Sequence, residues 1–179
     1  TAFASAVTGS VFPTGALGAS LTGNVVTPTS GGLAEFPVLQ VDTACRMLQL
    51  KFASGALEAV TSPFVVHGAP SFITIENFLG STLGSSASVV SATAIAPRVQ
   101  VSLYDLFGIL ALTRSDQIDA SLEPNIHGAL LEGTVNTTAE AGVAFFHNLS
   151  ISRACTGLVL RFTLHTDSSM FVLSPPFEV

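Results

Sequence analysis

The stretch that decides the fold is Gly142-Val-Ala-Phe-Phe-His-Asn-Leu-Ser-Ile-Ser-Arg-Ala-Cys-Thr-Gly-Leu-Val-Leu-Arg-Phe162, because the chain contains it twice. The other copy reads Gly32-Leu-Ala-Glu-Phe-Pro-Val-Leu-Gln-Val-Asp-Thr-Ala-Cys-Arg-Met-Leu-Gln-Leu-Lys-Phe52. With a constant shift of 110 residues (155 − 45 = 110) and no gap, 9 of the 21 positions are identical. A sequence that repeats in this way predicts a repeated structural unit.

Each copy has the pattern of two strands joined by a corner. The shared positions Ala144 and Phe146 are alternate residues, so they lie on one face of a strand. Phe145, which is Glu35 in the first copy, faces the other way. The small and polar residues 152–157 suit a turn. A second alternating run, typical of a half-buried antiparallel strand, follows the turn: Leu158, Leu160 and Phe162.

These residues carry a resemblance to a known family. The order Gly-Val-Ala-x-Phe-x-x-Leu-x-Ile, Ala-x-x-Gly-x-x-Leu and Ser-x-x-Phe-x-Val is similar to the terminal half of an immunoglobulin-like (invasin/filamin-like) repeat. That repeat occurs in tandem in very large surface proteins of bacteria, algae and other protists. Residues 97–108 resemble the family's Pro-x-Val-x-Val-x-x-x-Asp-x-x-Gly segment, and Pro70-Ser-Phe-Ile resembles its opening strand. Cys45 and Cys155 are a departure, since the family usually has Gly or Thr there.

The resemblance implies an all-β chain of immunoglobulin-like β-sandwich repeats in an end-to-end array. Residues 68–179 correspond to a complete repeat and residues 1–67 to the C-terminal part of another. Ser10-Val-Phe-Pro13 aligns with Ser121-Leu-Glu-Pro124, which leaves the first unit without equivalents of residues 69–111. We therefore expect the chain to be an excerpt from a longer array, semi-rigid because the junction between units is short.

Composition supports the all-β assignment and excludes several classes of partner. The chain is 48% hydrophobic and only 10% charged, against roughly 25% charged in soluble domains. No apolar run approaches the roughly 20 residues of a membrane helix, so we expect no membrane span. The net charge is −6, and the single lysine and five arginines are dispersed, which argues against a nucleic-acid partner.

The sequence contains no pattern typical of a catalytic or metal site. The four histidines are scattered, no Gly-x-Ser-x-Gly motif is present, and no Cys or His spacing suits zinc. We therefore expect no enzyme, no catalytic residue, no metal and no cofactor. Three acidic residues invite comparison with a calcium site, but their spacing fits a solvated edge better: Asp116, Asp119 and Glu123.

Two triplets predict N-glycosylation. Asn136-Thr-Thr138 and Asn148-Leu-Ser150 are Asn-x-Ser/Thr acceptors without proline at the middle position, conditional on a eukaryotic source. Attached sugar would solubilise a surface that has few charges. Phe145 is a candidate exposed contact residue, with an isolated exposed apolar side chain as the alternative.

The two cysteines are predicted not to pair with each other. Cys45 and Cys155 occupy equivalent positions of successive repeats, one module length apart, whereas a disulfide needs Cα atoms roughly 4.4–6.8 Å apart. Two interpretations stay open: each is a small buried residue, or each bonds a cysteine on a neighbouring chain.

Together these features predict a structural repeat module of a large extracellular or cell-surface glycoprotein that coats a cell, a cilium or a filament. Its expected partners are neighbouring repeats, neighbouring chains and an N-linked glycan. The alternative is an adhesin module that binds carbohydrate or a partner protein through loops 80–88 or 105–109. A third class is an enzyme that carries such repeats as accessory modules, with its active site elsewhere.

Overall fold

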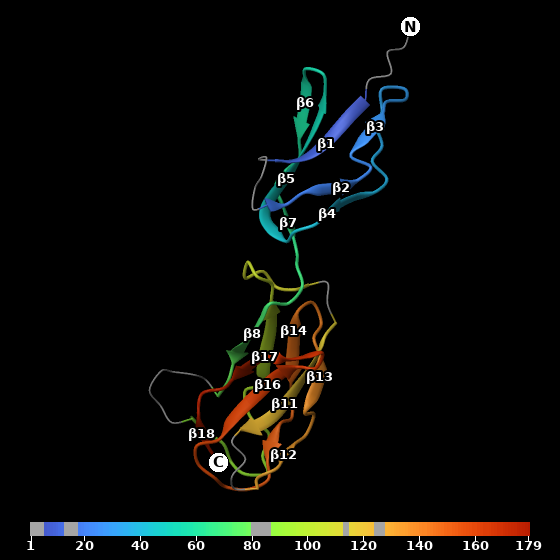
Figure 1. Ribbon diagram of the computed structural model, residues 1–179. Coiled ribbons are helices and arrows are strands. Elements are labelled where there is room, and N and C mark those ends of the chain that lie inside the picture. The colour runs from blue at the N-terminus through green and yellow to red at the C-terminus, as the bar shows by residue number, and fades with distance from the viewer. Residues whose placement is uncertain (1–5, 13–17, 80–86, 113–114, 124–127) are drawn as a thin grey trace. The chain divides into compact units, whose positions relative to one another are not determined.

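The computed structural model is built from β-strands (Figure 1). It describes residues 6–12, 18–79, 87–112, 115–123 and 128–179. Over these ranges the chain contains no α-helix, which confirms the predicted all-β class. The chain divides into two compact units, Thr1–Gly68 and Ala69–Val179, which we call the first and second units.

The first unit is built on one main sheet with the strand order β3-β1-β5-β6, and β7 also pairs with β5. A separate pair joins β2 and β4. The strands are β1 (Ala6–Phe12), β2 (Leu21–Gly23), β3 (Val26–Pro28), β4 (Leu39–Val41), β5 (Cys45–Ser54), β6 (Leu57–Val60) and β7 (Phe64–Val66).

The second unit has two principal sheets, β13-β11-β16-β17 and β14-β10-β8. Two short pairs, antiparallel β12-β15 and parallel β18-β9, complete it. The strands are β8 (Phe72–Asn77), β9 (Ala87–Ser88), β10 (Val99–Tyr104), β11 (Gln117–Glu123), β12 (Leu131–Glu132), β13 (Asn136–Thr138), β14 (Val143–Phe146), β15 (Ser150–Ile151), β16 (Val159–Leu164), β17 (Asp167–Leu173) and β18 (Phe177–Glu178).

The core of the second unit lies between its two principal sheets, a sandwich-like arrangement. Alternate residues of β10 and β16 are buried in one cluster, as expected for sheets that pack face to face. The rings of Phe146, on β14, and Phe162, on β16, join the two sheets with centroids 5.0 Å apart. The alternation predicted for Ala144 and Phe146 is confirmed, since both are buried.

The same strand pairings occur in both units. Ser10 lies opposite Lys51 where β1 pairs with β5, and Ser121 lies opposite Arg161 where β11 pairs with β16. The shifts (121 − 10 = 111 and 161 − 51 = 110) are those of the sequence alignment. The pairs β2-β4 and β12-β15 correspond in the same way.

One aromatic contact is also repeated. Phe36 and Phe52 have ring centroids 4.9 Å apart at 51°, and the equivalent Phe146 and Phe162 are 5.0 Å apart at 55°. Identical residues therefore meet in the same geometry in both units.

In each unit, a glycine at an equivalent position lies close to a backbone carbonyl group. Gly23 has φ +94° and Gly133 has φ +92°. A Cβ added to Gly23 would lie 2.3 Å from the Val38 oxygen, and one added to Gly133 would lie 2.1 Å from the Asn148 backbone oxygen. Both the dihedral angle and the close approach require glycine.

A hydroxyl group completes the ladder at one point in both units. In the second unit the Leu160 N–H donates to Ser174 Oγ at 2.9 Å, while the Ser174 N–H donates to the Leu160 oxygen at 2.8 Å. In the first unit the Leu50 N–H donates to Thr61 Oγ1 at 3.0 Å, and the Thr61 N–H returns a bond of 2.9 Å. Ser174 thus satisfies both the N–H and the C=O of Leu160, and Thr61 does the same for Leu50.

The units differ where β14 has no counterpart. Both copies of the repeat predict a strand here, but only the second copy forms one; residues 34–37 form none, and the prediction for the first copy is wrong. The physical reason is the neighbour: β14 pairs with β10, with Val101 opposite Ala144. Within the described residues, 34–37 pair with no strand.

Candidate functional site

Both predicted glycosylation asparagines are exposed in the second unit. Asn136 opens β13 and lies opposite Asp119 of β11. Asn148 lies between β14 and β15, and its Oδ1 accepts a hydrogen bond of 2.9 Å from the Thr134 N–H. That bond uses Oδ1 and not Nδ2, the atom to which an N-linked sugar is attached. Both side chains are therefore accessible for the predicted modification.

Phe145 lies on the strand face opposite to that of Ala144 and Phe146, and its ring is half-buried. The Arg98 guanidinium stacks over this ring, with the Arg98 Cζ atom 4.0 Å from the ring centroid. A cation in this position is attracted by the negative face of the aromatic ring. The candidate contact residue is thus covered in part by its own unit.

The three acidic residues do not gather into one site. Asp119 Oδ2 lies 2.7 Å from His165 Nδ1, and Glu123 Oε1 forms an ion pair of 2.7 Å with Arg161 Nη1. Asp116 is buried, so the prediction that it lies on a solvated edge is wrong for this residue. Across the described ranges, no group of three or more His, Cys, Asp or Glu side chains could hold a metal ion.

Arg161 organises the outer face of β16, a role that the sequence analysis missed. Besides Glu123, its guanidinium bonds Thr163 Oγ1 at 3.1 Å and stacks over the Phe171 ring at 4.0 Å. The equivalent residue of the first unit, Lys51, pairs with Glu58 at 2.6 Å. In both units, the sequence feature that could have indicated this ion pair is a basic residue between two apolar residues of an alternating strand.

The two cysteines lie in different units, each as a free thiol. Cys45 is 1% exposed, and burial raises the pKa of its thiol. Cys155 is half-buried, with its Sγ atom 3.3 Å from the Arg153 oxygen. Both pair with the closing segment of their unit: Cys45 lies opposite Val66, and the Cys155 backbone bonds that of Val179.

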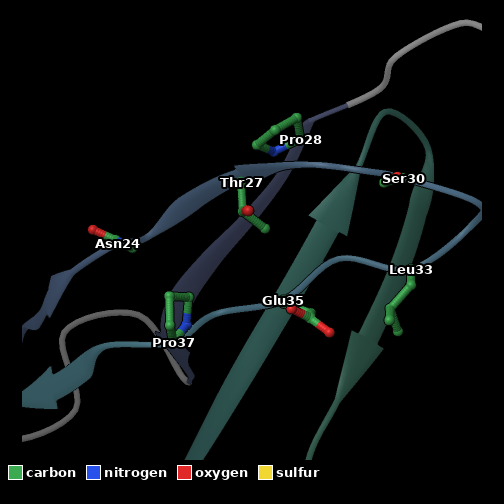
Figure 2. Close-up of a pocket in the computed structure, with 7 residues that line it drawn as sticks. All are labelled: Asn24, Thr27, Pro28, Ser30, Leu33, Glu35 and Pro37. Atoms are coloured by element: carbon green, nitrogen blue, oxygen red, sulfur yellow. The ribbon is translucent and has the colours of Figure 1, made fainter.

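A surface groove of about 470 Å³ lies in the first unit. Figure 2 shows its lining on two stretches of chain: Asn24 with strand β3, and the stretch from Ser30 to Pro37. Of the described lining residues, Glu35 alone carries a carboxylate. The lining residues are Asn24, Thr27, Pro28, Ser30, Leu33, Glu35 and Pro37.

The loops named for the adhesin alternative are described only in part. Residues 80–86 of the loop 80–88 lie outside the described residues, and Ala87–Ser88 form β9. The turn 105–109 is fixed by Asp105, whose Oδ1 accepts the N–H groups of Phe107 and Ile109 at 2.9 and 3.0 Å. Gly108 adopts a positive φ there, +68°.

No helix in the described part of the chain is long and apolar enough to cross a membrane.

Among known proteins, the chain matches solved structures only. No family model matches the chain, and no curated protein matches it. The apo structure of Bacteroides uniformis beta-glucuronidase 3 has a TM-score of 0.42 and 14% identity. The Parabacteroides merdae beta-glucuronidase has a TM-score of 0.41 and 13% identity. Each alignment covers 98% of this chain and 21% of the solved chain, so this chain spans about a fifth of their length.

These structures contradict the prediction that the chain is not an enzyme, because both are enzymes. The prediction rests on the lack of a catalytic motif in 179 residues. That reasoning fails because one domain of a large enzyme need not contain the catalytic residues. The exclusion is withdrawn, and at these scores the likeness assigns no activity to the chain.

Proposed function

We propose that the chain is a tandem immunoglobulin-like structural module of a large extracellular or cell-surface glycoprotein. The observation that carries the proposal is the repetition of strand pairings, of the Phe36–Phe52 ring contact and of the Gly23 close approach in the second unit. Units that repeat both register and packing suit an array whose role is to extend and space, as in the invasin/filamin-like proteins that the sequence resembles.

Two features of the surface support an extracellular setting. The chain is only 10% charged, and both acceptor asparagines are exposed. A glycan on Asn136 or Asn148 would supply the hydration that charges supply elsewhere. In such a coat, the partners are neighbouring repeats and neighbouring chains, and the coated structure is a cell, a cilium or a filament.

The groove of the first unit favours a second candidate function, an adhesin. Its walls combine hydroxyl, amide and carboxylate groups with two prolines, Pro28 and Pro37, a surface that suits a carbohydrate or an extended peptide. Saturable binding to a glycan or peptide array that is lost in Glu35→Ala would establish this candidate over the first.

Glycopeptide mass spectrometry of material from the native source tests the glycoprotein assignment. We expect sugar on Asn136 and Asn148. In a secreting eukaryotic host, Thr138→Ala and Ser150→Ala should each remove one glycan, whereas the matched variants Thr138→Ser and Ser150→Thr should keep it. Native material with both asparagines unmodified would overturn the assignment.

Antibody labelling of intact source cells tests the location. We expect labelling of intact cells, with permeabilised cells as the control. Labelling that requires permeabilisation would reject a surface coat.

A further inference from the structure

Within the described residues, no strand covers one face of the first unit, whereas the same face is covered in the second unit. In the second unit, β10 lies beside β14, with Val101 opposite Ala144 and Val99 opposite Phe146. On its other edge β10 pairs with β8. These strands form the sheet that closes the core over Phe162.

The first unit contains the residues that are equivalent to β14, the strand that pairs with β10 in the second unit. Ala34 and Phe36 are the equivalents of Ala144 and Phe146, and the Phe36 ring already contacts Phe52 at 4.9 Å. The segment 34–37 is thus anchored by its aromatic ring where β14 would be. Between described residues, Ala34, Glu35 and Phe36 form no backbone hydrogen bond. We call 34–37 the open edge.

Identical side chains at equivalent positions are more exposed in the first unit than in the second. Phe162 and Leu160 are 0% exposed, whereas Phe52 and Leu50 are only half-buried. Phe146 is 1% exposed, whereas Phe36 is half-buried. Full burial of an apolar side chain is favourable, so a surface of this kind favours a partner that completes it.

We propose that this face of the first unit binds a two-stranded β-segment that adds to the open edge, with the sequence pattern of β8 and β10. The occupant is a polypeptide and not a small apolar ligand, because an edge needs partners for its backbone N–H and C=O groups as well as for its side chains.

The second unit specifies the side chains of that occupant. The buried apolar residues of the covering strands are Ile73, Val99, Val101 and Leu103, and those of β10 are alternate residues; Ser102, on the other face of β10, is buried as well. The residues between them, such as Gln100 and Thr74, are half-buried on the other face. A partner therefore carries Val, Ile or Leu at every second residue over about five residues of the strand that contacts 34–37. The inference rests on the repeat architecture in the proposed function, but not on glycosylation or cell-surface location.

The test uses the full 179-residue chain and a fluorescent synthetic peptide with the sequence of residues 69–112. We expect saturable binding by anisotropy, and slower amide exchange at Glu35 and Phe36 in the bound chain. The peptide variant Val101→Asn should bind at least tenfold more weakly, while the matched variant Gln100→Asn, on the opposite face, should bind as the parent does. Since these changes are in the peptide, they leave the folding of the chain untouched.

A change in the chain provides the reciprocal test. Phe36→Asp should weaken binding at least tenfold, and its neighbour Glu35→Asp should not. Failure of the parent peptide to bind, equal binding of Val101→Asn, or protection confined to the second unit would each overturn the inference. Protection of the open edge by self-association of the chain, without peptide, would identify a second copy as the occupant and would also overturn it. A negative result together with surface labelling of intact cells would reject this inference and leave the proposed function standing.

Discussion

The two units place the same aromatic pair in the same geometry, yet only one pair is sealed from water. Phe146 and Phe162 are at most 1% exposed, while Phe36 and Phe52 remain half-buried. The side chains are identical and the centroid distances agree within 0.1 Å (5.0 − 4.9 = 0.1). The difference comes from the sheet β8-β10, which covers one pair and has no counterpart over the other among the strands that the structure describes. Burial here is a property of the neighbouring strand and not of the residue itself.

The largest expected contrast follows from truncating this pair. Phe162→Ala should lower the free energy of unfolding of the second unit by about 3–5 kcal/mol, since it leaves a cavity in a closed core. Phe52→Ala should cost the first unit only about 1–2 kcal/mol, because its ring is partly in water already. Amide exchange in β11 and β16, compared with β1 and β5, reports each unit separately. Phe171→Ala, on the exposed outer face, is the control. Equal losses in the two units would show that Phe52 is as well covered as Phe162.

A smaller contrast is expected at the hydroxyl groups that complete the ladders. Ser174→Ala should destabilise the second unit by about 1–3 kcal/mol, because it leaves the Leu160 N–H without an acceptor beside a buried residue. Thr61→Val should cost less, since Leu50 is half-buried and water can replace the hydroxyl. Urea unfolding followed by amide exchange measures both losses. Ser174→Thr keeps the acceptor and should restore most of the stability; a variant as unstable as Ser174→Ala would point to shape and not to the hydrogen bond.

The smallest contrast concerns pH. The Ser20 N–H donates to Asp42 Oδ1 at 2.8 Å, and at the equivalent place the Leu130 N–H donates to Ser152 Oγ at 2.9 Å. Hydrogen bonds from the Ser20 hydroxyl and backbone hold the pKa of Asp42 below its usual value of 3.8. This contact should therefore be complete above about pH 3.8 and weaken as the pH falls through the lower folded-state value, whereas the Ser152 hydroxyl does not titrate.

Amide protection of Ser20 and Leu130, corrected for intrinsic exchange, measures that difference. Protection should fall in acid at Ser20 more than at Leu130. Asp42→Asn keeps the side-chain oxygen and removes the titration, so it should abolish the difference; its persistence would assign the acid effect to another group.

The sequence pattern predicts which residues of a strand share a face, but it does not predict which distant strand pairs with it or packs over it. The faces of Ala144 and Phe146 followed from a period of two. The same pattern at Ala34 and Phe36 predicted a strand that does not form, because a strand needs a partner that lies far away in the sequence. The stacking of Arg98 on Phe145 and the ion pair of Arg161 with Glu123 also escaped prediction, since they join residues 47 (145 − 98 = 47) and 38 (161 − 123 = 38) positions apart.

The shifts between equivalent residues record where the two copies have diverged in length. The shift is 111 at β1, 110 across the shared stretch and 113 at the closing strand (177 − 64 = 113), so the shift changes at two places along the alignment. One of them is the hairpin after Phe52 and Phe162: Phe52 lies opposite Ala59, while Phe162 lies opposite Val172, three residues farther along (10 − 7 = 3). The turn itself is unchanged, because Ser54 lies opposite Leu57 as Leu164 lies opposite Asp167; the three extra residues lie in β17 between Asp167 and Phe171, where the register shifts. This irregular part of β17 has therefore already accepted extra residues beside a paired strand, and a short epitope or spectroscopic label inserted between Asp167 and Phe171 should leave the pairing of Arg161, Phe162 and Thr163 intact.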